Sequence, residues 1–257
     1  MFGVKNKKKF ELRCILLFLV FLLIFQIIYY KKIIKIRPFM TVVPTPPSEK
    51  AIKALTFGDE EFYFRIKSFQ VQTMGDTFGN ATPLADYNYE KLYYWMNYLD
   101  KFDNKSNYLT SIAAYYYGST PKTEDTIYII KFLEEHADKN LAENWWWLYQ
   151  ATYLAKYVYK DNNLSLRLAR KLRETSPENA PLWTKKLEGI FLFDNNELCE
   201  SLRVMTDIMR DYENDKTKTD EEKAKELNYM KFFIEKNIER LNNINIDYND
   251  CYKKEGK

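Results

Sequence analysis

The chain begins with one long apolar run and continues with shorter stretches in which apolar residues recur at helical spacing. Residues 14–30 form seventeen positions without a charge, a glycine or a proline. A helix of this length spans about 25 Å, and three more isoleucines up to Ile36 extend it toward the roughly 30 Å of a bilayer core. The pattern predicts a transmembrane signal anchor over residues 14–36, preceded by a basic tail over residues 1–13.

The residues around the apolar run indicate how the chain would enter the membrane. No small-residue cleavage site follows the run, which favours a retained anchor over a cleaved signal peptide. Five Lys and Arg residues precede the run and four follow it, so the positive charge slightly favours a cytoplasmic N-terminus. We expect a single-pass membrane protein with its domain on the non-cytoplasmic side, as in a bacterial inner membrane facing the periplasm.

Helical spacing dominates the remainder of the chain, and no strand-like alternation is long enough to predict a sheet. A proline-rich linker over residues 37–48 leads into a helical domain over residues 49–245, which a polar tail over residues 246–257 follows. The stretch Thr219-Asp-Glu-Glu222 is a capping box that predicts the start of the last helix. The predicted fold class is all-α.

An early helix of this domain carries both a start signal and an apolar face. Asp59 is placed to cap it, and Phe62, Ile66 and Phe69 then share one face. The acids at positions 59–61 fall in its first turn, where negative charge is favoured by the helix dipole.

Paired helices joined by short Asn/Asp turns resemble tetratricopeptide repeats. Trp147 with Ala151, followed by Pro177, resembles one repeat, and Trp183 begins another 36 residues later, against a family period of about 34. The turns between the helices differ in length from the family pattern. The resemblance covers residues 88–212 and implies an α-α superhelical (solenoid) domain whose concave groove would bind proteins or peptides. With the apolar run, the predicted architecture is a transmembrane helix followed by this domain.

Charge is distributed unevenly between the two parts of the chain. Residues 1–40 carry nine Lys and Arg against one acid, a net charge of +8, while the whole chain has +3. Residues 41–257 therefore have a net charge of −5. A mildly acidic domain argues against nucleic acid as a partner, because nucleic-acid binding depends on a basic face.

Cysteine and histidine are too few and too dispersed to predict a metal site or a cofactor. Cys14 lies in the apolar run, and Cys199 and Cys251 are far apart. An oxidising compartment would allow a bridge between the last two, but we expect them to be unpaired. The single histidine, His136, falls late in a helix, where the helix dipole and solvent contact account for it.

Three aromatic triplets are the first candidates for a partner-binding surface. Consecutive helical residues point 100° apart, so each triplet overfills a core-facing stripe about 100° wide. The surplus rings either pack against neighbouring repeats or line a groove as interface anchors. The middle residue of each triplet is the exposed candidate: Tyr94, Tyr116 and Trp146.

The glycine-containing loop over residues 75–83 is the second candidate. It lacks the lysine and the spacing of a phosphate-binding loop, and simple helix punctuation would explain its glycines. If it contacts a ligand or a peptide, Asp76, Thr77 and Phe78 are the residues expected to do so.

No catalytic motif is present in the sequence, and we predict a non-enzymatic role. The leading hypothesis is a membrane-anchored adaptor or scaffold that holds other membrane or envelope proteins through protein–protein contacts. The alternative is a membrane-bound enzyme that acts on envelope polymers with an acidic residue from positions 59–76. A third hypothesis is a structural role in which the anchor and the last helix promote self-association. The oligomeric state is left open.

Overall fold

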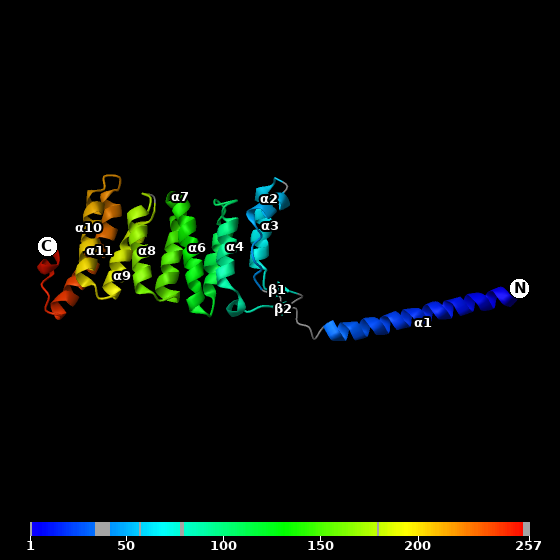
Figure 1. Cartoon of the computed structure of the whole chain (residues 1–257). Coiled ribbons are helices and arrows are strands. Elements are labelled where there is room, and N and C mark those ends of the chain that lie inside the picture. The colour runs from blue at the N-terminus through cyan, green and yellow to red at the C-terminus, as the bar shows by residue number, and fades with distance from the viewer. Residues whose placement is uncertain (1, 34–41, 57, 78–79, 179, 254–257) are drawn as a thin grey trace. The chain divides into compact units, whose positions relative to one another are not determined.

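The computed structural model describes residues 2–33, 42–56, 58–77, 80–178 and 180–253 (Figure 1). The chain divides into two compact units, Met1–Thr41 and Val42–Lys257. The first unit contains a single described helix, α1 (Phe2–Ile33). Its stretch Cys14–Lys31 has a mean hydropathy of 2.3 and no buried residue. This helix is long and apolar enough to cross a membrane, and the same properties suit a signal sequence.

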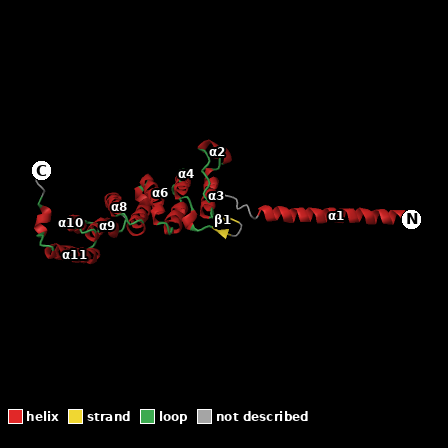
Figure 2. Ribbon diagram, turned by 60° about the horizontal axis from the view of Figure 1, so that its bottom comes forward, coloured by secondary structure: helices red, strands yellow, loops and turns green. Residues whose placement is uncertain are grey.

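The second unit is built almost entirely from helices (Figure 2). Its elements are α2 (Glu49–Leu55), α3 (Glu60–Gln72), β1 (Asp76–Thr77), β2 (Asn80–Ala81), η1 (Leu84–Asp86), α4 (Tyr89–Leu99), α5 (Asn107–Ser111), η2 (Ile112–Tyr116), η3 (Tyr117–Ser119), η4 (Thr123–Asp125), α6 (Thr126–Lys139), α7 (Leu141–Tyr153), η5 (Leu154–Val158), α8 (Asn162–Thr175), α9 (Leu182–Asp194), α10 (Leu198–Asn214), α11 (Asp220–Asn243) and η6 (Tyr248–Tyr252). Of the elements labelled η, η2 and η5 are π-helical, and the others are 3-10 helices. The all-α class is confirmed.

Local capping bonds begin several of these helices where the sequence predicts them. The Asp59 carboxylate accepts a hydrogen bond of 2.9 Å from the amide of Phe62 and so starts α3. Thr219 and Glu222 exchange both bonds of the predicted capping box at the start of α11. These bonds satisfy amide groups that the helix itself leaves unpaired.

The helices of the second unit stand side by side in chain order, and each packs mainly on its neighbours in sequence (Figure 1). A continuous hydrophobic core runs from α2 to α8, and two smaller clusters join α9, α10 and α11. The second unit is therefore a series of consecutive helix pairs that pack against each other.

The start of the second unit packs on its helices. Val43 is buried in the large core, and the indole Nε1 of Trp95 donates a hydrogen bond of 2.7 Å to the carbonyl oxygen of Pro44. The described part of the predicted proline-rich linker is thus attached to α4.

The apolar face predicted for α3 points away from the core. Phe62, Ile66 and Phe69 are 60%, 40% and 59% exposed, while Tyr63 and Phe64 are buried. Both sides of this helix carry large apolar residues, so helical periodicity could not decide which side packs on α4.

A disulfide bond joins Cys199 in α10 to Cys251 in η6, with Cα atoms 4.9 Å apart. The expectation that these cysteines are unpaired was wrong. Helix α10 and the C-terminal turn approach each other through tertiary packing, which a separation of 52 residues in sequence does not reveal. The disulfide is consistent with a domain outside the cytoplasm.

Candidate functional site

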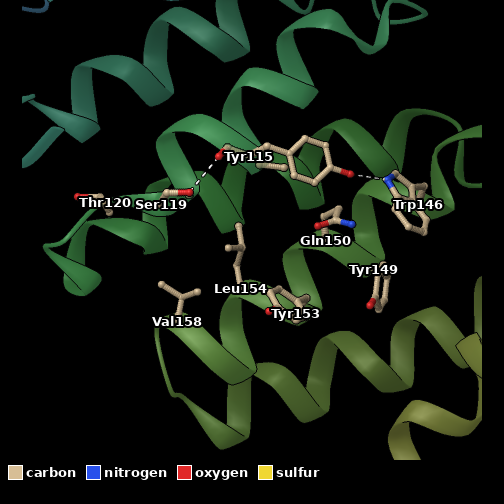
Figure 3. Close-up of a pocket in the computed structure, with 11 residues that line it drawn as sticks. Tyr115, Ser119, Thr120, Trp146, Tyr149, Gln150, Tyr153, Leu154 and Val158 are labelled. Atoms are coloured by element: carbon tan, nitrogen blue, oxygen red, sulfur yellow. Dashed lines mark hydrogen bonds between the residues drawn. The ribbon is translucent and has the colours of Figure 1, made fainter. Parts of the chain in front are cut away.

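Two adjoining cavities form a groove over η2, α7 and α9. The larger, of about 550 Å³, lies between η2–η3 and α7–η5 (Figure 3). The smaller, of about 400 Å³, shares Tyr149 and Tyr153 with it and continues to α9. We call the two together the aromatic groove. Its lining residues are Ala114, Tyr115, Gly118, Ser119, Thr120, Trp146, Tyr149, Gln150, Thr152, Tyr153, Leu154, Tyr157, Val158, Leu187 and Phe191.

Helix α7 and the turn η5 supply most of the aromatic rings. Trp146, Tyr149, Tyr153 and Tyr157 follow at intervals of three or four residues, which places them on one face of the helix. The opposite side of α7 carries Trp147 and other buried residues that pack in the core. Helix α7 is therefore apolar toward the core and aromatic toward the groove.

The two π-helical turns adjoin the groove. They are η2, which follows α5, and η5, which follows α7. Gly118, just after η2, allows close approach of the two segments, because a Cβ atom there would lie 3.2 Å from a methyl group of Leu154. A π-helical turn shifts the side chains that follow it around the helix, and such turns are frequent at functional sites.

Neighbouring aromatic residues hold the groove rings in place. The Nε1 of Trp146 donates a hydrogen bond of 3.0 Å to the hydroxyl of Tyr115, and the two side chains reach toward each other in Figure 3. The ring of Tyr149 packs edge-on against Trp183 with centroids 4.6 Å apart. Such contacts stabilise ring pairs by about 0.5–1.5 kcal/mol beyond the area that they bury. The groove therefore offers a largely pre-formed surface.

The groove is uncharged at neutral pH. None of its lining residues is an acid, a lysine, an arginine or a histidine. Burial, aided by nearby tyrosines, raises the pKa of the Tyr149 hydroxyl, and burial together with Asp194 raises that of Tyr157. These hydroxyls remain neutral hydrogen-bonding groups. The arrangement suits an uncharged ligand that offers apolar surface and hydrogen-bonding groups.

The three aromatic candidates from the sequence lie in different places. Trp146 lines the groove. Tyr116 is exposed but packs edge-on against Tyr117 at 4.9 Å and is not among the lining residues. Tyr94 is exposed on α4 and packs edge-on against Tyr93.

Sequence reasoning missed most of the aromatic groove. Tyr115, Tyr149, Tyr153 and Tyr157 were not singled out, although two signals for them are present. The four aromatic residues of α7 and η5 have helical spacing, and Tyr115, Tyr149 and Trp183 follow one another at intervals of 34 residues. The argument from the triplets considered only consecutive residues, whereas the groove is lined by residues that lie one helical turn apart.

The loop candidates lie in a small hairpin. Asp76 is exposed in β1, and Thr77 pairs with Asn80 of β2, while Phe78 lies outside the described residues. Tyr87 packs against the base of this hairpin, where a Cβ atom on Gly75 would come within 1.8 Å of its hydroxyl.

A group of tyrosines lies next to this hairpin. Burial, with smaller effects of Tyr116 and Asp76, raises the pKa of Tyr87 to about 12. Burial likewise raises the pKa of Tyr117, whose hydroxyl donates to the carbonyl of Val71 in α3. The structure thus brings two sequence candidates, Asp76 and Tyr116, near the same group, but not into the groove.

Most of the polar groups considered at the sequence level have structural partners. Asp59 caps α3, and Glu61 pairs with Arg65 one turn later. His136 is 1% exposed, contrary to the expected solvent contact, and its Nδ1 lies 2.7 Å from a carboxylate oxygen of Asp100. Within the described part of the chain, no three His, Cys, Asp or Glu residues are grouped so as to hold a metal ion.

No protein-family model matches the chain, and no curated protein and no solved structure is similar enough to count as a match.

Proposed function

We propose that the protein is a single-pass membrane adaptor that binds an extended, uncharged segment of another membrane or envelope protein in the aromatic groove. The observation that carries this proposal is the set of exposed or half-exposed rings on one uncharged surface: Tyr115, Trp146, Tyr149, Tyr153 and Tyr157. Tyr and Trp are enriched among the residues that dominate binding energy at protein interfaces.

A tetratricopeptide-like solenoid is the architecture that we propose for the domain. The groove takes its residues from η2, α7 and α9, while α6 and α8 lie between them in sequence. The 34-residue interval from Tyr115 through Tyr149 to Trp183 equals the period of that repeat family. Both features support a groove built by successive repeats.

Two features support a membrane-attached domain on the non-cytoplasmic side. Helix α1 has the length and composition of a membrane span, and the Cys199–Cys251 disulfide suits an oxidising compartment. Attachment would confine the domain to the membrane surface and raise its effective concentration toward partners there.

Site-specific photocrosslinking of the full-length chain in intact membranes tests the adaptor function. A photoreactive phenylalanine analogue replaces Tyr153 in the groove, and in a matched chain it replaces Phe232, an exposed residue of α11. We expect one or a few membrane proteins to crosslink through position 153 and not through 232, and a further Trp146→Ala change to reduce these adducts. Equal labelling from both positions, or protein adducts unaffected by Trp146→Ala, would refute the groove as the binding site.

Protease treatment of sealed cells and of inverted vesicles tests the topology. We expect the domain to be digested only from the non-cytoplasmic side, with the α1 fragment retained in the membrane. Digestion from the cytoplasmic side would reverse the proposed orientation, and release of the intact domain into the soluble fraction would indicate a cleaved signal sequence.

A further inference from the structure

The rings of α7 and η5 form two pairs of nearly the same geometry along the aromatic groove. The ring centroids of Trp146 and Tyr149 lie 5.2 Å apart with an interplanar angle of 46°, and those of Tyr153 and Tyr157 lie 5.0 Å apart at 47°. Figure 3 shows Trp146, Tyr149 and Tyr153 around the larger cavity. The groove therefore offers two similar apolar contact points, one after the other.

The distance between the two pairs is close to one turn of a polyproline II helix. Trp146 and Tyr153 are seven residues apart within α7, which corresponds to about 10.5 Å along the helix axis. A polyproline II helix has three residues per turn and rises about 3.1 Å per residue, so the same face recurs after about 9.3 Å. A segment that runs along α7 in this conformation can place one proline ring on each pair.

The polar atoms of the groove suit a ligand that offers carbonyl groups. The Tyr115 hydroxyl accepts the hydrogen bond from Trp146, so its own proton can be donated to a ligand. Tyr149, Tyr153 and Tyr157 bring further hydroxyl groups to the same surface. A polyproline II segment has no internal hydrogen bonds and its prolines lack an N–H, so its backbone presents mainly carbonyl acceptors. Donors on the groove thus complement acceptors on the ligand.

We infer that the segment bound in the aromatic groove is an uncharged, proline-rich stretch in the polyproline II conformation, with prolines three residues apart. This inference rests on the proposed function and names the chemistry of its ligand. Aromatic-lined grooves bind such stretches at a low entropic cost, because the polyproline II helix is ordered before it binds. The chain already holds one proline-containing stretch in a similar way, since the indole of Trp95 donates to the carbonyl of Pro44.

Other kinds of ligand fit the groove less well. A helical segment pairs its own N–H and carbonyl groups, so it would cover the groove hydroxyls without supplying partners for them. A β-strand needs a strand edge to pair with, whereas the groove is built on the helical segments η2, η3, α7, η5 and α9. A glycan can stack on the rings, but its hydroxyl groups also need acceptors, and no carboxylate is among the lining residues.

Calorimetric titration of the full-length chain in lipid nanodiscs with acetylated and amidated peptides tests this inference. Decaproline should bind. Pro-Gln-Gln-Pro-Gln-Gln-Pro-Gln-Gln-Pro should bind at least fivefold more tightly than a peptide of the same composition with two prolines at each end, because only the first repeats proline at every third position. Equal affinity of these two peptides, or no binding of decaproline, would overturn the inference.

Substitutions in the two ring pairs locate the binding. Trp146→Ala and Tyr153→Ala each remove one ring from a different pair, and each should weaken decaproline binding at least tenfold. Tyr94→Ala is the matched control, because Tyr94 is an exposed ring on α4 outside the groove lining. Far-UV circular dichroism checks that the variants keep their helix content. Binding unaffected by Trp146→Ala and Tyr153→Ala, or weakened equally by Tyr94→Ala, would contradict the assignment.

Photocrosslinking from position 153 separates this inference from the adaptor function. Excess decaproline should reduce the crosslinked protein adducts several-fold. Adducts that persist in excess decaproline would refute the proline-rich ligand and leave the adaptor function in place, whereas a complete absence of protein adducts would refute both. Binding of cellohexaose that is lost in Trp146→Ala, without any binding of decaproline, would assign the groove to glycans instead.

Discussion

The indole nitrogen of Trp146 donates a hydrogen bond of 3.0 Å to the hydroxyl of Tyr115, a residue from a different helical segment. This bond joins α7 to η2 at the surface of the aromatic groove. Each ring limits the rotation of the other, so less conformational entropy is lost when a ligand binds. The two residues are therefore expected to act together in recognition.

Removal of either ring should weaken partner capture. Tyr115→Ala or Trp146→Ala is expected to lower affinity by about 2 kcal/mol, roughly thirtyfold, as for central aromatic residues at interfaces. The yield of photocrosslinks from position 153, measured against partner dilution, checks this. Tyr116→Ala is the matched control, because Tyr116 is an exposed neighbour of Tyr115 outside the groove lining. A comparable loss in that control would show that the effect is not specific to the groove.

The disulfide should contribute substantially to the stability of the C-terminal part of the domain. Cys251→Ser opens a loop of 52 residues, and the chain-entropy relation gives a loss of about 4 kcal/mol in the free energy of unfolding. Thermal unfolding followed by circular dichroism checks this. Reductant should lower the melting temperature of the native chain but not that of Cys251→Ser, and Cys14→Ser should behave like the native chain. No change on reduction would show that the bond does not stabilise the fold.

The buried carboxylate of Glu188 should be more important for stability than the half-exposed carboxylate of Glu200. Glu188 is 1% exposed, and Arg170 and Arg173 both donate to it. Glu188→Ala leaves two partly exposed guanidinium groups without this acceptor, and losing hydrogen bonds between charged groups of this kind should cost about 1.5–3 kcal/mol.

Glu200 provides the matched control, because it also binds Arg170 but its side chain is 42% exposed. Glu200→Ala should cost less than about 1 kcal/mol, as exposed ion pairs do. Urea unfolding of both variants measures the two losses in free energy. Equal losses would contradict the role that burial assigns to Glu188.

Alkaline pH should destabilise the domain through its buried tyrosines. Burial is the largest cause that raises the pKa of Tyr87, Tyr89 and Tyr93 to about 12. Tyrosines of the unfolded chain ionise near pH 10, so above this pH the unfolded state loses protons before the folded state does. Stability is therefore full below about pH 10 and falls as pH rises toward 12.

Absorbance at 295 nm and circular dichroism, recorded against pH, test this expectation. The late fraction of tyrosine ionisation should coincide with the loss of helical signal. Tyr87→Phe removes one of these ionisable groups, so it should make the alkaline loss of stability less steep. Complete tyrosine ionisation near pH 10 in a domain that stays folded would contradict the prediction.

Several features of this protein could be predicted because they depend on interactions within a few residues. The apolar run in α1 needs only its own composition to be identified, and the caps at Asp59 and Thr219 are completed within three residues. Helical class follows from the same short-range signals, because each turn of a helix repeats the pattern of the turn before it.

The groove could be predicted only in part. Trp146 was identified because a run of three tryptophans overfills a helix face, but this argument gave no reason to prefer Tyr115 to Tyr116. The two π-helical turns change which side chains face the groove, and the unperturbed helical spacing used at the sequence level does not include them.

The amino-acid sequence alone was enough to predict the apolar span-like helix, the helical domain and the starts of α3 and α11, because these features arise from contacts between near neighbours in the chain. Features that join segments distant in sequence became known only from the packing of the folded chain. This packing joins Cys199 to Cys251, buries His136 against Asp100, and places Tyr115 beside Trp146. It also leaves Phe62 exposed, because α3 has apolar residues on both sides and only one side packs against α4.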